Sequence, residues 1–247
     1  KVIMLKTSVS IIIPVYNRES LVSETIASCV EQDHRDVEII LVDDGSTDKT
    51  LETLQEWANK DSRIKVLSSV NQGLSIARNV GVAASTGQYY WFLDSDDLLM
   101  PYSVSTLLHY ALEYEAELVF GGEVGFVSNH HEQEGISIEE AKERALSSLD
   151  SKESNEDEPY IDKIGDFLQK YSFSFNNALV NKSVYWQTGG FSSKLRGCED
   201  SEMFRRMSLI RTETKIYYRK NPLVLLKRLG HYSLAKQIND LSDGVHW

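Results

Sequence analysis

The segment Val9-Ser10-Ile11-Ile12-Ile13-Pro14-Val15-Tyr16 is a nearly continuous run of apolar, mostly β-branched residues. Such a run is typical of a strand buried on both faces, as strands are in a parallel sheet. Because proline cannot donate a hydrogen bond to a neighbouring strand, we expect the hydrogen-bonded part of this strand to end at Pro14. The segment predicts an α/β protein built on a mostly parallel sheet.

The following hundred residues alternate short apolar runs with segments of helical periodicity. We expect further strands at 37–42, 64–67, 89–93 and 118–120, and helices at 21–30, 49–59, 74–84 and 101–114. Strands that alternate with helices form right-handed crossovers, which place the helices against the sheet. The sequence therefore predicts a mostly parallel central sheet flanked by helices.

The composition excludes several classes of protein. The 247 residues include 37 acidic and 26 basic side chains, for a net charge of -11, which disfavours nucleic acid as a partner. No stretch reaches the ~18 consecutive apolar residues of a membrane helix, so we expect no transmembrane segment. Two distant cysteines, Cys29 and Cys198, cannot form a disulfide framework, and they favour a reducing compartment, the cytoplasm.

The character of the chain changes after Gly121-Gly122. We expect one half at residues 1–122 and a second at residues 123–247. Segment 128–159 is rich in Glu and Asp and is expected to be mobile, apart from a surface helix at 138–149.

Polar residues follow three of the predicted strands where each strand ends. They are Tyr16-Asn17, Asp43-Asp44 and Asp94-Ser95-Asp96-Asp97. Ligands of open parallel sheets bind outside the carboxyl ends of the strands. We therefore expect the three groups to form one site.

The carboxylates of Asp94, Asp96 and Asp97 repel one another unless they are solvated or bind a cation. Hard divalent ions such as Mg²⁺ take one or two carboxylates together with substrate phosphates. The alternative is that Asp96 or Asp97 caps the next helix.

Asp44 and Arg78 could each either bind a ligand or serve a structural role. Asp44 could accept hydrogen bonds from a base ring or a ribose, or the Asp43-Asp44 pair could form an Asx turn. Arg78 could bind a phosphate or carboxylate of the ligand, or it could pair with one of the Asp groups.

Four segments in order resemble the family 2 glycosyltransferases. They are Val9–Asn17, Val42–Asp48, Gln72–Asn79 and Phe92–Asp97. The resemblance implies the GT-A nucleotide-diphospho-sugar transferase fold, a divalent cation (Mn²⁺ or Mg²⁺) and an inverting sugar transfer. It makes residues 1–122 the half that binds the nucleotide-sugar donor, and 123–247 a C-terminal acceptor-side subdomain that also holds the catalytic base.

The resemblance also implies roles for single residues. Asp96 would be the main metal ligand, Asp94 would contact ribose and metal, and Asp97 would help to hold the sugar. Asp44 would meet the base, commonly uracil. The other residues expected to line the nucleotide-sugar site are Pro14, Val15, Tyr16, Asn17, Gly73, Arg78 and Ser95.

The second half matches the family at two places. In Gly197-Cys198-Glu199-Asp200, the resemblance makes Asp200 the general base and Glu199 the residue that orients acceptor or base. The alternative is a pair of acids that stabilises a helix N-terminus. In Arg228–Ser233, Arg228 would contact the diphosphate, and His231 would complete the metal shell or serve a structural role.

These expectations define a function and its rivals. The chain would move a sugar, with a UDP-sugar as the favoured donor, to a hydroxyl of a carbohydrate, lipid-linked or protein acceptor in bacterial-type polysaccharide or glycoconjugate synthesis. A lipid-linked acceptor would place it peripherally at the inner face of the membrane. One rival is a nucleotidyltransferase, but Tyr16-Asn17-Arg18-Glu19 lacks a glycine-rich phosphate loop. The other is an inactive module that binds sugar nucleotides or glycans.

Overall fold

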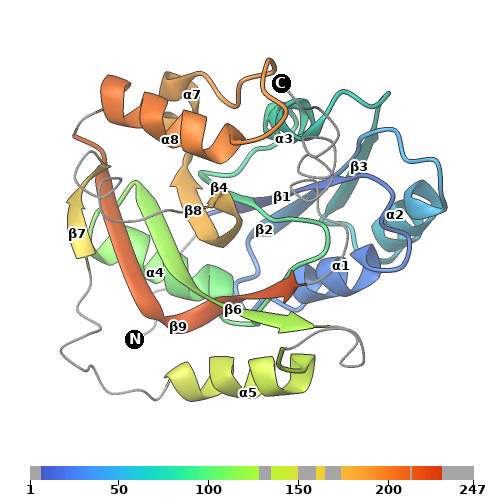
Figure 1. Cartoon of the computed structure of the whole chain (residues 1–247), viewed down its shortest axis with the longest axis horizontal. Coiled ribbons are helices and arrows are strands. Elements are labelled where there is room, and N and C mark those ends of the chain that lie inside the picture. The colour runs from blue at the N-terminus through green and yellow to red at the C-terminus, as the bar shows by residue number, and fades with distance from the viewer. Residues whose placement is uncertain (1–6, 128–134, 150–159, 165–173, 212, 230–247) are drawn as a thin grey trace, which may run out of the picture.

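The computed structural model describes residues 7–127, 135–149, 160–164, 174–211 and 213–229. Within these ranges a nine-stranded sheet carries helices on both faces (Figure 1). The strands are β1 (Val9–Val15), β2 (Val37–Asp43), β3 (Ile64–Ser68), β4 (Tyr89–Phe92), β5 (Leu98–Leu99), β6 (Leu118–Val127), β7 (Tyr160–Lys163), β8 (Ala178–Asn181) and β9 (Lys215–Leu229). The helices are α1 (Val22–Val30), α2 (Thr50–Lys60), α3 (Leu74–Ala83), α4 (Ser103–Glu113), α5 (Ile138–Leu149), α7 (Lys182–Thr188) and α8 (Glu199–Ile210), with a 3-10 turn, η1 (Phe175–Asn177).

The strand order is β3-β2-β1-β4-β8-β6-β9-β5, and β7 pairs with β9. Strands β1 to β4 are parallel, β8 runs antiparallel between β4 and β6, and β6 is parallel to β9. The predicted α/β fold with a mainly parallel sheet is confirmed. The chain runs outward from β1 to β3 and then returns to β4 on the other side of β1, so the order reverses between β1 and β4. Such a reversal opens a crevice at the carboxyl ends of the two strands.

The hydrogen-bonded part of β1 does not end at Pro14. Its pairing with β2 continues through Pro14↔Val42 and Val15↔Asp43. The Ile12 carbonyl accepts from Leu93 N–H on the β4 side, whereas the Val15 carbonyl accepts from Asp44 N–H on the β2 side. Backbone groups of neighbouring strand residues face opposite sides, so Pro14 faces β4, as Ile12 does. The pairing of β1 with β4 ends at Ile12↔Phe92, so the missing N–H of Pro14 does not interrupt the pairing with β2.

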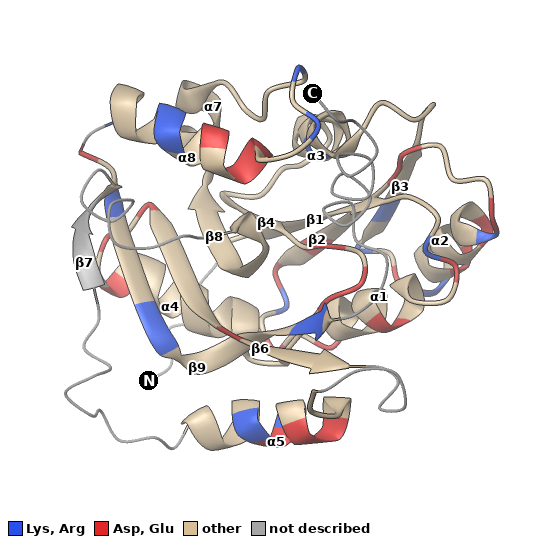
Figure 2. Cartoon of the chain, viewed as in Figure 1, with Lys and Arg blue, Asp and Glu red and all other residues tan. Residues whose placement is uncertain are grey.

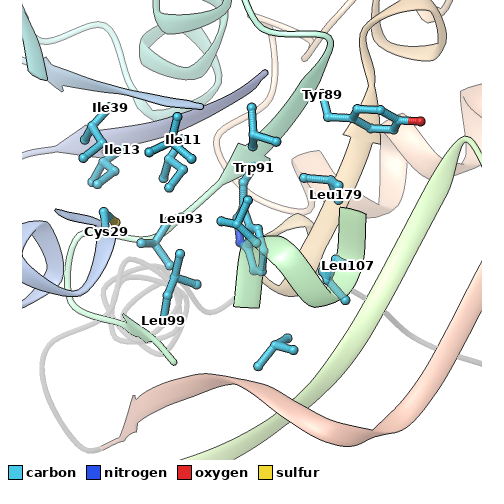
Figure 3. Close-up of a cluster of buried hydrophobic side chains, with 14 of the residues drawn as sticks. Ile11, Ile13, Cys29, Ile39, Tyr89, Trp91, Leu93, Leu99, Leu107 and Leu179 are labelled. Carbon is cyan, nitrogen blue, oxygen red and sulfur yellow. The ribbon is translucent and has the colours of Figure 1, made fainter. Parts of the chain in front are cut away.

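Alternate residues of the central strands enter different cores. Ile11 and Ile13 are fully buried with side chains of α1, α2 and α4 (Figure 3), whereas Ile12 packs with α3, α7 and α8 on the other face. Each fully buried aliphatic side chain contributes about 1.5–3 kcal/mol. The strand ends that carry the polar residues are therefore fixed from both faces of the sheet.

The glycine pair at 121–122 lies inside β6, which runs continuously from Leu118 to Val127. A Cβ on Gly122 would lie 1.8 Å from the Lys220 carbonyl oxygen, and one on Gly121 would lie 2.3 Å from a Val224 methyl. The pair thus permits β6 to approach β9, and the strand expected at 118–120 is longer than predicted. The division into a donor half and an acceptor half remains a functional proposal.

Other expectations had mixed outcomes. The helix at 138–149 is confirmed as α5, which packs on β5, β6 and β9. The helix expected from Pro101 begins later, at Ser103. Residues 128–134 and 150–159 of the acidic segment lie outside the described residues, so its expected mobility stays a prediction.

Candidate active site

The loops after β1 and β2 are joined by Asn17. Its backbone is in the left-handed region (φ 51°), which asparagine tolerates better than most residues. Its side-chain oxygen accepts from Thr47 N–H at 2.8 Å, and its own N–H donates to Ser46 Oγ at 3.0 Å. Tyr16 beside it is 41% exposed, whereas Pro14 and Val15 are buried in β1. The first two polar groups therefore form one continuous edge.

Asp43 and Asp44 are both buried, and each accepts two hydrogen bonds from neutral donors. Asp43 accepts from Ser46 N–H, three residues on, and from Ser68 Oγ of β3, so it closes the loop after β2 without forming an Asx turn. The two Asp44 oxygens accept from the N–H groups of Gln72 and Gly73, each at 2.8 Å. Asp44 thus holds the loop before α3, and each oxygen keeps a second lone pair for a ligand.

The segment Asp94–Asp97 forms a tight turn after β4, closed by Asp97 N–H to the Asp94 carbonyl. The turn leads into β5, and α4 begins only at Ser103, so neither Asp96 nor Asp97 caps a helix. Ser95 is buried within this turn. The helix-cap alternative for these acids is therefore wrong.

Asp97 is almost completely buried, at 2% exposure. It accepts from Arg228 N–H at 2.7 Å and from the side-chain amide of Asn176. Burial, reinforced by the charges of Asp94 and Asp96, raises the pKa of Asp97 to about 7, although these hydrogen bonds oppose the shift. Asp97 therefore attaches β9 to the acidic turn.

Arg78 lies at the centre of the site. Its side chain, on α3, is 2% exposed, and it contacts Asp94 at 3.2 Å, Asp200 at 2.8 Å and Glu199 at 3.6 Å. Its guanidinium also lies over the Phe191 ring, 5.0 Å from the centroid. Of the two roles considered for Arg78, the structure has the ion pair with acidic residues. Burial alone would lower its pKa, but the three acids outweigh burial and raise it.

Asp200 reaches this centre from the first turn of α8, which is acidic (Figure 2). Besides the bond from Arg78 to its Oδ1, its Oδ2 accepts from Ser174 Oγ at 3.0 Å and from Phe175 N–H at 3.1 Å. Helix α8 begins after Cys198, whose φ is 56° and whose side chain makes no capping bond. The structure thus brings Asp200 and Glu199 to Asp94 through Arg78.

Asp96 lies beside two arginines from distant parts of the chain. Its Oδ2 is 3.4 Å from Arg18 Nε, and its carbonyl accepts from Arg228 Nε at 3.0 Å. Arg228 is buried, pairs with Glu24 of α1 and lies over the Phe126 ring. In this structure Arg228 joins β9 to the turn and to α1, and its contact with a diphosphate stays a prediction.

The charges around the turn suit a divalent cation. Among the described residues, six carboxylates (Glu24, Asp94, Asp96, Asp97, Glu199 and Asp200) lie near three guanidinium groups (Arg18, Arg78 and Arg228). Burial and the charges of Asp96 and Asp200 raise the pKa of Asp94, although the charge of Arg78 lowers it. The raised pKa means that a negative charge is unfavourable at this position, and a bound cation would relieve that cost. Although the surrounding protein desolvates Asp94 enough to raise its pKa, 39% of its side-chain surface stays open to solvent.

Within the described ranges, no three His, Cys, Asp or Glu side chains converge as a complete metal site. The carboxylates of Asp94 and Asp96 nevertheless fit Mg²⁺ or Mn²⁺, because these ions can take their remaining ligands from water and substrate phosphates. His231, the third expected ligand, lies outside the described residues.

Four contributors were not found from the sequence: Arg18, Glu24, Ser174 and Asn176. The Asn176 side chain accepts from Asp94 N–H at 2.8 Å and donates to Asp97, so it holds both ends of the acidic turn. The local signal was weak, because two amides before an apolar strand are compatible with any loop. Arg18 and Glu24 gave no signal, since their partners are far away in the sequence.

No helix in the described part of the chain is long and apolar enough to cross a membrane.

The chain is similar in sequence to curated relatives and in fold to solved structures. The chain is 40% identical over 114 residues to an uncharacterized glycosyltransferase of Haemophilus influenzae, a match that covers 46% of each chain. It is 37% identical over 128 residues to glycosyltransferase GlyA of Streptococcus pneumoniae, covering 52% of this chain and 18% of GlyA. The matched segments therefore span less than half of these relatives.

Among solved structures, S. aureus TarS 1–349 in complex with UDP-GlcNAc matches with a TM-score of 0.73. The match covers 93% of this chain and 60% of that one at 19% identity, so it establishes the fold. The sequence model of glycosyl transferase family 2 matches residues 10–189, well over half of the chain. The chain therefore belongs to glycosyl transferase family 2.

Proposed function

We propose that this chain transfers a sugar from a UDP-sugar to an acceptor hydroxyl with inversion at the anomeric carbon. The acceptor would be a carbohydrate, a lipid-linked or a protein hydroxyl, in the synthesis of a polysaccharide or glycoconjugate. Family membership supports the reaction class, and the UDP-GlcNAc bound by TarS supports the donor class. Inversion would follow from a single displacement, in which Asp200 takes the acceptor proton and no covalent bond forms between the sugar and the enzyme.

The observation that carries the proposal is the contact of Arg78 with both Asp94 and Asp200. One buried guanidinium lies 3.2 Å from the first carboxylate and 2.8 Å from the second. Asp94 follows β4 at the donor edge, whereas Asp200 belongs to α8 of the second half. A donor held at Asp94 and Asp96 would therefore have a carboxylate of the other half next to its sugar.

In the reaction, the acceptor oxygen would form a bond to the anomeric carbon as the bond from that carbon to the diphosphate breaks. Asp200 would take the hydroxyl proton during attack. A divalent cation held by Asp94 and Asp96 would supply a Lewis acid for the charge on the leaving diphosphate. Asn17 and Asp44 would contact the nucleoside at the edge formed by the β1 and β2 loops.

A module that binds sugar nucleotides without turnover is the second candidate. It is disfavoured because Asp96, Asp200 and Arg78 are all present and the last two contact each other. Release of UDP from UDP-GlcNAc, with water or a glycan as acceptor, separates an enzyme from such a module.

The proposed donor is tested by a thermal-shift screen of UDP-, GDP- and dTDP-sugars with and without Mn²⁺. We expect a UDP-sugar to raise the melting temperature only with Mn²⁺, and Asp96→Ala to abolish this shift. Asp33→Asn is the matched control, because Asp33 is an exposed carboxylate bonded to Ser105 outside the site. A shift that survives in Asp96→Ala, or no shift with any sugar nucleotide, would contradict the proposal.

A further inference from the structure

The segment Ser174–Asn176 touches both groups of carboxylates. Asn176 is 1% exposed, and both ends of its side-chain amide contact the acidic turn: Oδ1 accepts from Asp94 N–H, and Nδ2 donates to Asp97. Its carbonyl accepts from Trp91 Nε1 at 2.7 Å, which fixes it to β4. The orientation of the Asp94–Asp97 turn therefore depends on one buried amide.

Two residues earlier, the same segment holds Asp200. Ser174 Oγ and Phe175 N–H both donate to Asp200 Oδ2, and Ser174 Oγ also accepts from Asn176 N–H at 3.2 Å. The Phe175 ring stacks on Phe204 of α8, with centroids 4.1 Å apart. The segment is thus attached to the helix that carries Asp200.

These contacts restrict how Asp200 can meet an acceptor. A carboxylate offers about four acceptor positions. Arg78, Ser174 and Phe175 donate to three of them. The remaining position has a fixed direction, and it is the one that an acceptor hydroxyl could use.

We propose that Ser174–Asn176 is a positioning segment that fixes the donor-side carboxylate turn and Asp200 relative to each other. Asn176 acts through the Asp94–Asp97 turn, and Ser174 acts through Asp200. The inference rests on the proposed function for its kinetic consequence. It deepens that function, because it assigns donor placement and base placement to different residues of one short segment.

The kinetic test uses release of UDP from UDP-GlcNAc, with water in place of the acceptor and Mn²⁺ present. Ser174→Ala should lower kcat about 10-fold to 100-fold with little change in UDP binding, because the base loses its orientation. Asn176→Ala should weaken UDP–Mn²⁺ binding by a similar factor, because the acidic turn loses its anchor. Ser174→Thr, which keeps the hydroxyl, should recover most of the kcat.

Asn177→Ala is the matched control. Asn177 is also buried, in the same turn, but its amide donates to the Gly121 carbonyl and contacts no carboxylate of the site. It should lower the melting temperature without the kcat or binding change. If Ser174→Ala and Asn177→Ala behave alike, or if Ser174→Thr does not recover kcat, the inference is overturned.

A second arm needs no donor. Unfolding in urea of Ser174→Ala, Asp200→Ala and the double variant should be non-additive, and so should the cycle of Asn176→Ala with Asp97→Ala. Additive effects in both cycles overturn the inference. If the wild-type protein binds no UDP-sugar, the proposed function fails, and the two cycles still decide whether the segment joins the carboxylates.

Discussion

Two pairs of acids lie at the same edge of the sheet but in different environments. Asp43 and Asp44, after β2, accept hydrogen bonds from hydroxyl and backbone N–H donors close by. Asp94 and Asp200, after β4 and at the start of α8, share one buried arginine. Neutral groups of nearby loops donate hydrogen bonds to the first pair. The two aspartates of the second pair come from distant parts of the chain and contact the same charged side chain.

The difference separates aspartates that accept hydrogen bonds from neutral loop groups from aspartates that lie among other charges. Neutral donors satisfy a carboxylate without bringing other charges near it. Among the described residues, more carboxylates than guanidinium groups gather around the acidic turn, and the pKa values of Asp94 and Asp97 are raised. The two pairs should therefore respond differently to the same kind of substitution.

The largest effect is expected for Arg78→Met, which keeps the volume and removes the charge. Asp94, Glu199 and Asp200 would then face one another without their shared partner, and we expect a loss of about 3 kcal/mol in the free energy of unfolding. Arg144→Met on α5 removes an exposed pair with Glu140 and should cost only about 0.3–0.5 kcal/mol. Urea unfolding measures both, and equal costs would contradict the central role of Arg78.

A smaller effect is expected for Asp44→Asn. An asparagine has one acceptor oxygen, so its NH₂ group would face an N–H of Gln72 or Gly73, at a cost of about 2 kcal/mol. Asp43→Asn should cost less, because the Ser68 hydroxyl can turn and accept from the new amide. The two urea midpoints test this order, and a larger loss for Asp43→Asn would show that Asp44 does not hold the loop.

The smallest effect is the pH dependence of stability. With a pKa of about 7, folded Asp97 keeps at pH 6 a proton that the unfolded chain has released. Stability should therefore fall as the pH rises, by about 1 kcal/mol between pH 6 and pH 8 in the presence of EDTA. Asp97→Asn should remove this part of the slope. If the wild-type slope is unchanged in Asp97→Asn, Asp97 is not its source.

The first half of the fold was predictable because its signals are local. The strand at Val9, the helix at Leu74 and the turn at Asp94 each follow from a short pattern of residues. The motifs also placed Arg78 and Asp200 among the site residues, but their contact joins residues that are 122 positions apart. No local pattern contains that information.

The second half was less predictable for the same reason. Gly121-Gly122 indicated a boundary, yet the pair permits close approach of β9, a strand that the sequence analysis did not predict. Asn176 gave only a weak signal, because its importance comes from its contacts with the backbone of Asp94 and the carboxylate of Asp97, which are distant in the sequence. The sequence did not indicate that Arg228 contacts the Asp96 carbonyl and Glu24, and its expected contact with a phosphate stays a prediction.

The central claim is that Asp200 serves the chemical step and Asp94 and Asp96 serve the donor. It is tested most directly by measuring UDP–Mn²⁺ binding and UDP release from UDP-GlcNAc in wild type and Asp200→Asn. The substitution keeps the shape and one acceptor oxygen for Arg78, but it places an NH₂ group against Phe175 N–H and should lower the melting temperature. We still expect binding within about twofold and a loss of at least about 10²-fold in kcat. An Asp200→Asn protein that releases UDP at the wild-type rate would show that Asp200 is not the base.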